Sequence, residues 1–244
     1  MRAREPSSWI IPLGRAVAAG LITLILASLL LRQGAPRAAE GSVSLPAAAV
    51  DSQKTAGPPQ TAVLSGGCFW GVQAVFEHVK GVRQVLAGYS GGRENLAHYE
   101  MVSTGTTGNA ESVQITFDPA EVSYGEILRV FFSVAHDPTQ RDRQGPDVGT
   151  QYRSEIFYAN PEQQRIATAY IAQLEQAHLF ASRIATRVDP LKGFYRAEGY
   201  HQDYLVHHPE DPYIVYNDLP KLASLHRVMP DVYREQPILV AATR

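Results

Sequence analysis

Apolar residues recur from residue 61 onward with the spacings expected of alternating strands and helices. Val113, Ile115 and Phe117 alternate with polar residues, which is typical of a strand that buries one face. Ser123 followed by Glu126 matches a capping box at the start of a helix. The same reasoning predicts strands over 61–65, 82–89, 110–117, 154–158 and 183–188, and helices over 69–78, 123–135 and 161–178.

The order of these elements predicts the fold class. A β-α-β-β-α-β run with further segments appended indicates an α+β protein, a two-layer α/β sandwich with a ferredoxin-like core. Long loops over 91–107 and 137–153 would have to build a functional site. Five prolines follow His207, so we expect a coil-rich C-terminal extension to wrap a domain that spans residues 61–235.

The first sixty residues follow a different pattern. Three arginines precede an apolar, uncharged run over residues 16–31. This run is slightly short for a spanning helix of about 17–25 residues and slightly long for a signal-peptide core of about 7–15. It has no polar face, which argues against a buried core helix. Residues 1–38 are therefore predicted to be an export signal, or a membrane anchor if it stays uncleaved, and the protein to be periplasmic or membrane-attached. Residues 39–60, rich in Ala, Pro, Gly and Ser, are predicted to be a flexible linker.

Composition restricts the chemistry. The chain has 244 residues and a formal net charge of -2, which gives no indication of nucleic-acid binding. Cys68 is its one cysteine, so no internal disulfide can form. If this thiol is oxidised in an exported protein, a reductant outside the chain must restore it.

Cys68 lies in the sequence Gly-Gly-Cys-Phe-Trp-Gly, between a predicted strand and a predicted helix. A helix N-terminus favours the thiolate, so we expect a lowered thiol pKa and a reactive sulfur. The two preceding glycines allow close approach of the backbone, and Phe69 and Trp70 would form an apolar wall. The alternative is a small buried side chain with no chemical role.

Other candidate residues occupy the long loops and the strand after the first of them. Glu111 begins the strand over 110–117, Tyr99 precedes it, and Asp147 and Tyr152 lie in the second loop. Each of these alone could equally be a surface carboxylate or a half-buried phenol. The eight histidines show no tight metal-ligand spacing, so no metal site is predicted.

Residues 61–233 resemble the A-type peptide methionine sulfoxide reductases, in particular the branch without resolving cysteines. Cys68 lies in one matching motif, and the run that ends Gly-Thr-Gln-Tyr-Arg-Ser at residue 154 is equally specific. The matching segments are 66–71 (GGCFWG), 85–92 (VLAGYSGG), 99–108 (YEMVSTGTTG), 110–111, 136–139 (HDPT), 143–154 (RQGPDVGTQYRS) and 200–205 (YHQDYL).

The resemblance implies a role for each candidate. Cys68 would attack the sulfoxide sulfur of S-epimer methionine sulfoxide, free or in oxidised proteins, and become a sulfenic acid. Glu111 would protonate the departing oxygen, which requires a carboxyl pKa raised by burial. Tyr99 and Tyr152 would hydrogen-bond that oxygen. Phe69 and Trp70 would hold the S-methyl group, and Asp147 the substrate backbone or its water network.

The chain departs from the family pattern in two respects. Gln73, Asn109 and Pro146 stand where Glu, His and Asn are usual, which affects tuning rather than the reaction. The C-terminal segment has no second cysteine. The sulfenic acid must then be reduced by an external thiol, such as thioredoxin, glutaredoxin or a small thiol, with no bound cofactor.

Two other functions remain open from the residues alone. A cysteine hydrolase or acyltransferase would pair Cys68 with a distant histidine such as His136 or His201. A binding module would recognise methionine sulfoxide without turnover, although the presence of both Cys68 and Glu111 argues against it.

Overall fold

A computed structural model describes residue 42 and residues 44–240. The predicted export signal or anchor, with its apolar run over 16–31, lies outside these residues. Within the described part of the chain, no helix is both long and apolar enough to cross a membrane.

Six strands form one mixed sheet in the order β7-β6-β1-β3-β2-β8. Neighbouring strands are antiparallel except β6 and β7, which are parallel. A separate antiparallel ribbon joins β4 and β5. The strands are β1 (Gln60–Gly66), β2 (Val82–Ser90), β3 (Ala110–Phe117), β4 (Arg143–Gln144), β5 (Asp147–Val148), β6 (Ser154–Tyr158), β7 (Arg187–Pro190) and β8 (Phe194–Arg196).

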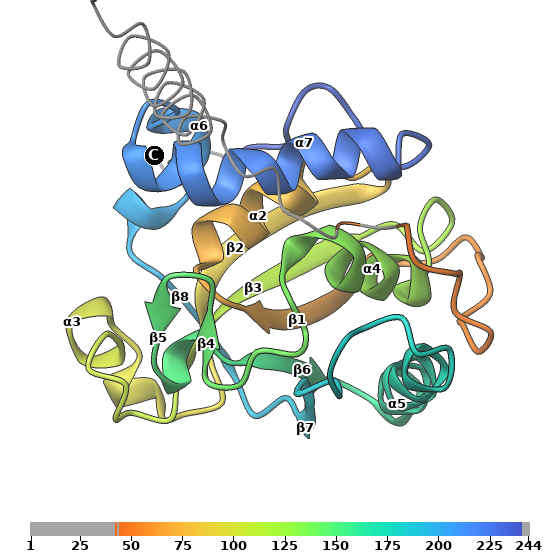
Figure 1. Cartoon of the computed structure of the whole chain (residues 1–244), viewed down its shortest axis with the longest axis horizontal. Coiled ribbons are helices and arrows are strands. Elements are labelled where there is room, and N and C mark those ends of the chain that lie inside the picture. Colours follow the sequence, from red (N-terminus) through yellow and green to blue (C-terminus); the bar gives the residue numbers. More distant parts are fainter. Residues whose placement is uncertain (1–41, 43, 241–244) are drawn as a thin grey trace, which may run out of the picture. The chain divides into compact units, whose positions relative to one another are not determined.

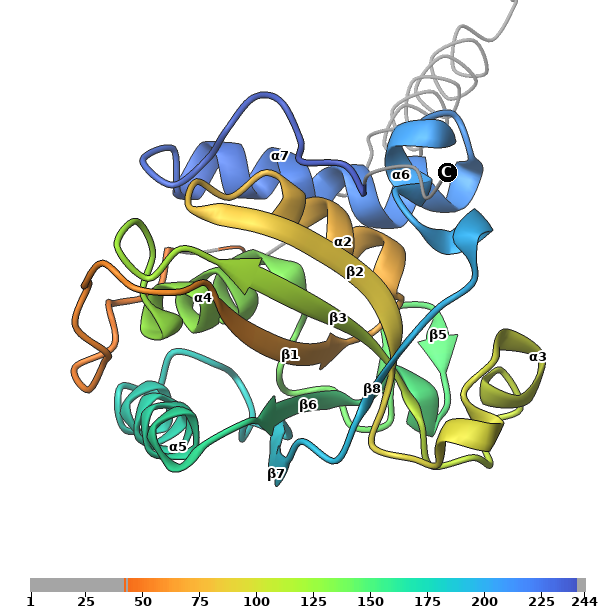
Figure 2. The same ribbon diagram turned by 180° about the vertical axis from the view of Figure 1, so that it is seen from behind.

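Helices α2 and α4 complete the predicted β-α-β-β-α-β core. Helix α2 connects β1 to β2, and α4 lies between β3 and β6. Seen from behind, the central strands lie in front of both helices, which confirms the α+β, two-layer arrangement (Figure 2). The helices are α2 (Phe69–Glu77), α3 (Tyr99–Val102), α4 (Tyr124–Val130), which continues as a π-helical turn over Phe131–Ala135, α5 (Pro161–Gln176), α6 (Tyr204–His207) and α7 (Leu219–Val228).

Strand β3 positions the acidic candidate of the site. Val113, Ile115 and Phe117 are fully buried in the core against the apolar face of α2, as their alternation predicts. Side chains two residues apart on a strand share a face. Glu111 therefore points into the same layer as Val113, at the end of β3 that meets the start of α2.

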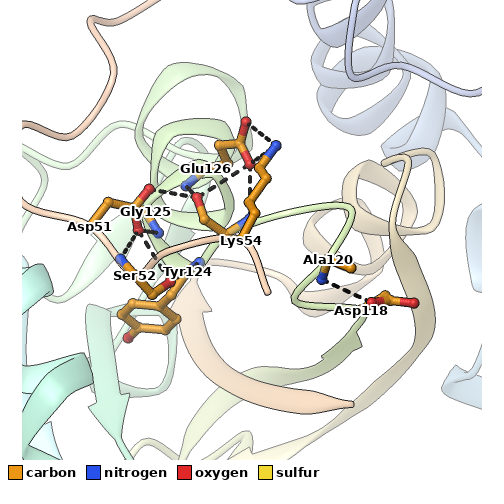
Figure 3. A network of polar contacts seen from close by, with 9 residues as sticks. Asp51, Ser52, Lys54, Asp118, Ala120, Tyr124, Gly125 and Glu126 are labelled. Carbon is orange, nitrogen blue, oxygen red and sulfur yellow. Dashed lines mark hydrogen bonds and ion pairs between the residues drawn. The ribbon is translucent and has the colours of Figure 1, made fainter. Parts of the chain in front are cut away.

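Residues 44–54 lie against the domain rather than linking to it loosely. The Leu45 side chain is buried in the core, and the Pro46 carbonyl accepts a hydrogen bond from Tyr170. The Asp51 carboxylate accepts a hydrogen bond of 2.5 Å from the Ser123 hydroxyl. It also accepts one of 2.7 Å from the Gly125 amide, at the start of α4 (Figure 3). These contacts correct the prediction of a flexible linker for residues 44–54. Composition could not reveal them, because each partner is distant in sequence.

The C-terminal segment is more regular than its prolines predicted. Residues Ile214–Asp218 form a π-helical turn and lead into α7, which lies beside α2 (Figure 1). Pro220 is in the first turn of α7, where a missing amide hydrogen costs nothing because it would have no helical partner. Strand β7 begins four residues later than the predicted strand, and β8 was not predicted.

Candidate active site

Cys68 lies where β1 ends and α2 begins. It is the N-cap residue of α2, 8% of the residue is exposed, and the backbone amide of Trp70 donates a hydrogen bond to its sulfur. Gly67 has a positive φ of 93°, and a Cβ there would come within 2.5 Å of the Gln144 side chain. Glycine is therefore required at this turn, which turns the chain from the sheet into the helix.

Glu111 meets the first turn of α2. Its Oε2 accepts a hydrogen bond of 3.0 Å from the Phe69 amide, and only 4% of the residue is exposed. Burial raises the pKa of Glu111 to about 8, the Phe69 amide opposes this rise, and the carboxyls of Asp147 and Asp218 add to it. The carboxyl therefore holds a proton at neutral pH beside Cys68.

The thiol itself is not activated in the way the sequence predicted. Burial, followed by the carboxyls of Glu111 and Asp218, raises the pKa of Cys68 well above its ordinary value. The amide of Trp70 and the ammonium of Lys221 lower this pKa, but by less. The expected lowering by the helix terminus is thus outweighed, since desolvation penalises a buried thiolate.

Two phenols face the thiol and the carboxyl. Tyr99 begins α3, and Tyr152 ends a short 3₁₀ turn that precedes β6. Burial raises the pKa of both phenols, and the charges of Glu111, Cys68 and Asp147 raise it further. Both hydroxyls are therefore neutral hydrogen-bond donors. The two long loops do bring Tyr99 and Tyr152 to one place.

Aromatic rings build one wall of the site. Trp70 is stacked on Tyr204, with ring centroids 3.7 Å apart and an interplanar angle of 8°, and its Nε1 donates a 3.1 Å hydrogen bond to His201 Nδ1. Phe69 is almost fully buried, and its ring lies 5.0 Å from that of His201. Trp70 is partly exposed, so it supplies the accessible apolar surface, and both its ring and that of Phe69 lie against His201.

Tyr213 belongs to the site, although no sequence motif predicts it. Its hydroxyl donates a 2.5 Å hydrogen bond to Asp147 Oδ2, and its ring lies edge-on to Trp70 at 5.9 Å. Burial raises its pKa, and the neighbouring Cys68 and Asp147 contribute. Tyr213 thus fixes the orientation of Asp147. The only signal for it in the sequence is an aromatic residue within a segment interpreted as coil.

Neither histidine of the hydrolase alternative is bonded to Cys68. His136 Nδ1 donates to the Phe131 carbonyl, its Nε2 is hydrogen-bonded to the Ser154 hydroxyl, and burial lowers its pKa to about 4. His201 instead accepts from Trp70. A nucleophile-and-base pair is therefore not formed. Across residues 44–240, no three His, Cys, Asp or Glu side chains are grouped to hold a metal ion.

Two of the three departures from the family pattern, Gln73 and Asn109, hold the backbone near the site. The buried Gln73 amide donates to the Val85 carbonyl and accepts from the Asp203 amide. Asn109 accepts from the Gly92 amide and so ties the loop between β2 and β3. Pro146 stands in the turn between β4 and β5, next to Asp147. None of the three is hydrogen-bonded to Cys68 or Glu111.

The chain is similar to known proteins of one family. A family model for peptide methionine sulfoxide reductase matches residues 60–231. A peptide methionine sulfoxide reductase of Mesorhizobium japonicum is 56% identical over 188 residues, which are 77% of this chain and 96% of that protein. One from Thermus thermophilus is 47% identical over 177 residues, 72% of this chain and 99% of that protein.

Solved structures agree with this similarity. Methionine sulfoxide reductase A of Corynebacterium diphtheriae superposes with a TM-score of 0.54 and 33% identity, covering 70% of this chain and 85% of that one. Reduced Mxr1 from Saccharomyces cerevisiae gives a TM-score of 0.56 and 31% identity, covering 65% and 93%.

Proposed function

Since the chain belongs to the peptide methionine sulfoxide reductases, enzymes that reduce methionine sulfoxide and repair oxidised proteins, we propose that Cys68 attacks the sulfur of the S epimer. The observation that supports this most directly is the buried Glu111 carboxyl. It is bonded to the Phe69 amide, at the first residue after Cys68, and keeps its proton at neutral pH. A nucleophile and an acid thus lie together at the start of α2.

The reaction transfers one oxygen atom and two electrons. The Cys68 thiolate forms a bond to the sulfoxide sulfur while the Glu111 proton passes to the sulfoxide oxygen. The hydroxyl group then transfers to the cysteine sulfur to give a sulfenic acid, while the bond between the methionine sulfur and oxygen and the bond between the two sulfurs break, and the thioether leaves as methionine. The cysteine sulfur is oxidised by two electrons, and the methionine sulfur is reduced by two.

The remaining side chains orient the substrate. Tyr99 and Tyr152 donate hydrogen bonds to the sulfoxide oxygen and stabilise the negative charge that develops there. The Trp70 face, backed by Phe69, receives the S-methyl group, and this defines which epimer fits. Asp147, held by Tyr213, binds the backbone amide of the methionine residue or its water network.

External thiols return the enzyme to its reduced state. A first thiol condenses with the Cys68 sulfenic acid to a mixed disulfide and water, and a second thiol releases Cys68 and leaves with the first as a disulfide. The single cysteine of the chain supports this scheme, since no internal partner is present. Thioredoxin, glutaredoxin or a small thiol would serve, and no bound cofactor is needed.

Turnover of separated epimers tests this function. With a peptide containing S-methionine sulfoxide and excess dithiothreitol, we expect many equivalents of methionine, measured by chromatography. In the R epimer the methyl group and the oxygen exchange positions, so the Tyr99 and Tyr152 hydroxyls lose the sulfoxide oxygen as their hydrogen-bond acceptor. The rate should then fall at least about 100-fold. Equal rates would contradict the epimer assignment, and no turnover of either would contradict the reaction.

The N-terminal residues support export. Three arginines before the apolar run over 16–31 fit an export signal or membrane anchor, with the enzyme in the periplasm or attached to the membrane. On cell fractionation, we expect the full chain in the periplasmic or membrane fraction and a chain without residues 1–38 in the cytosol. Finding both chains in the cytosol would contradict export.

A further inference from the structure

A buried ion pair beside the site takes no part in the proposed reduction of methionine sulfoxide. Lys221 Nζ, in the first turn of α7, lies 3.0 Å from Asp218 Oδ1. The Asp218 side chain is fully buried, and that of Lys221 is 16% exposed. Burying two charges costs desolvation energy even when they are paired. A buried ion pair kept beside the site despite this cost is therefore a candidate for a functional role.

Gly71 shows how close this pair comes to the catalytic helix. A Cβ at Gly71 would lie 2.1 Å from Asp218 Oδ1 and 3.0 Å from Lys221 Nζ, so only glycine leaves room for the pair. Gly71 follows Cys68 by three residues, and residues three apart share one side of a helical turn. The ammonium thus lies against the first turn of α2, where α7 packs along that helix (Figure 1).

The groups around the sulfur explain why a cation is needed there. A thiolate at Cys68 would face two carboxyls, Glu111 from β3 and Asp218 from the turn before α7. Lys221 is the one cationic side chain among the described groups that act on it. The charged and titratable groups that face Cys68 are Glu111, Asp218, Lys221 and the phenols of Tyr99, Tyr152, Tyr204 and Tyr213.

We propose that Lys221, held by Asp218 against the first turn of α2, is the cation that stabilises the thiolate form of Cys68. Asp218 positions the ammonium and at the same time limits its effect, because its own negative charge opposes the thiolate. Lys221 is a positioning residue in this scheme: it forms no bond to the substrate. The inference rests on the proposed role of Cys68 as the nucleophile.

Alkylation of the thiol tests the proposal without methionine sulfoxide. Cys68 is the only cysteine, so the rate of iodoacetamide labelling, followed by mass spectrometry across pH, reports this residue alone. Lys221→Met removes the charge and should move the midpoint of the profile upward by about one pH unit, a tenfold slower labelling at a fixed lower pH. Lys221→Arg keeps the charge and should restore most of the wild-type profile.

A second variant separates charge from packing. Asp218→Asn keeps the ammonium and removes the opposing carboxylate, so the midpoint should move downward. Loosened packing alone would expose the thiol in both variants and move both midpoints downward. Lys80→Met is the matched control, because Lys80 is an exposed lysine that follows α2 at its other end and binds the Asp231 carbonyl. Its midpoint should not move.

An unchanged midpoint in Lys221→Met, or shifts of the same sign in Lys221→Met and Asp218→Asn, would overturn the proposal. If Lys221→Met does not fold, as judged by circular dichroism, Lys221→Gln takes its place with the same expected rise, and a midpoint that stays or falls refutes the role of the pair. Failure of the proposed function would be seen separately, as absence of methionine formation by the wild-type enzyme.

Discussion

Replacement of Cys68 by serine is expected to abolish methionine formation, both with excess dithiol and in a single turnover. A serine hydroxyl is a far weaker nucleophile toward sulfur than a thiolate, and it cannot carry the oxygen as a sulfenic acid. The chain has no second cysteine that could substitute. We expect the rate to fall by about 10⁴-fold or more, as for loss of the nucleophile in other enzymes.

A single-turnover experiment measures this directly. Wild-type enzyme, incubated with S-methionine sulfoxide peptide and no reductant, should release one equivalent of methionine and gain one oxygen atom on Cys68 by mass spectrometry. Cys68→Ser should release none and gain no mass. Serine differs from cysteine by one atom, and circular dichroism verifies that the variant is folded. An equivalent of methionine from Cys68→Ser would remove Cys68 from the mechanism.

The core of the fold could be predicted because its signals are local. Strand β3 was predicted with its observed bounds, since alternation over residues 110–117 ends at Asp118-Pro119. The capping box of α4 was predicted for the same reason, because Ser123 and Glu126 are three residues apart and both bonds form. Such elements are determined by neighbours in sequence, and the order of the elements then limits the topology.

The segments that were missed depend on contacts between distant residues. Helix α7 follows a proline-rich stretch, and its packing on α2 could not be inferred from local composition. Asp51 fixes the segment before β1 through Ser123, 72 residues later. Tyr213 reaches Asp147 across 66 residues. Local pattern carries no information about such pairs, so both the missed phenol and the attached N-terminal segment required the structure.

The pKa of the Cys68 thiol also could not be predicted from sequence motifs alone. A helix N-terminus next to Cys68 was visible in the sequence and predicted a lowered pKa. The structure adds burial and two carboxyls, Glu111 and Asp218, which together outweigh the helix. The sign of the shift therefore depends on groups from β3 and from the segment before α7, which no single motif contains.

Replacement of Glu111 by glutamine is expected to lower kcat/KM for S-methionine sulfoxide by about 10²–10⁴-fold, the usual contribution of a general acid. Glutamine keeps the size of the side chain and can still accept a hydrogen bond from the Phe69 amide. It cannot deliver a proton to the sulfoxide oxygen. Steady-state rates with saturating dithiol measure the loss, and a decrease of less than about fivefold would exclude Glu111 as the acid.

The pH dependence of kcat/KM tests the role of Glu111 as the acid more specifically than the loss of rate in one variant. The reactive form needs Glu111 protonated and Cys68 deprotonated. Below the Glu111 pKa of about 8 the thiolate fraction grows with pH, so kcat/KM should rise tenfold per unit. Above about 8 the loss of protonated Glu111 cancels the gain in thiolate, and the profile should become flat until the higher pKa of Cys68 is reached.

In Glu111→Gln the bend near pH 8 should disappear, because no group then loses a catalytic proton there. Glu77→Gln is the matched control: Glu77, at the end of α2, is also buried, and burial together with a hydrogen bond to Asp203 raises its pKa to about 9. Glu77 has no contact with Cys68 among the described interactions, so its variant should keep both the rate and the bend. If the bend persists in Glu111→Gln, it belongs to the titration of another group. Glu111 is then not the residue that gives a proton to the sulfoxide oxygen.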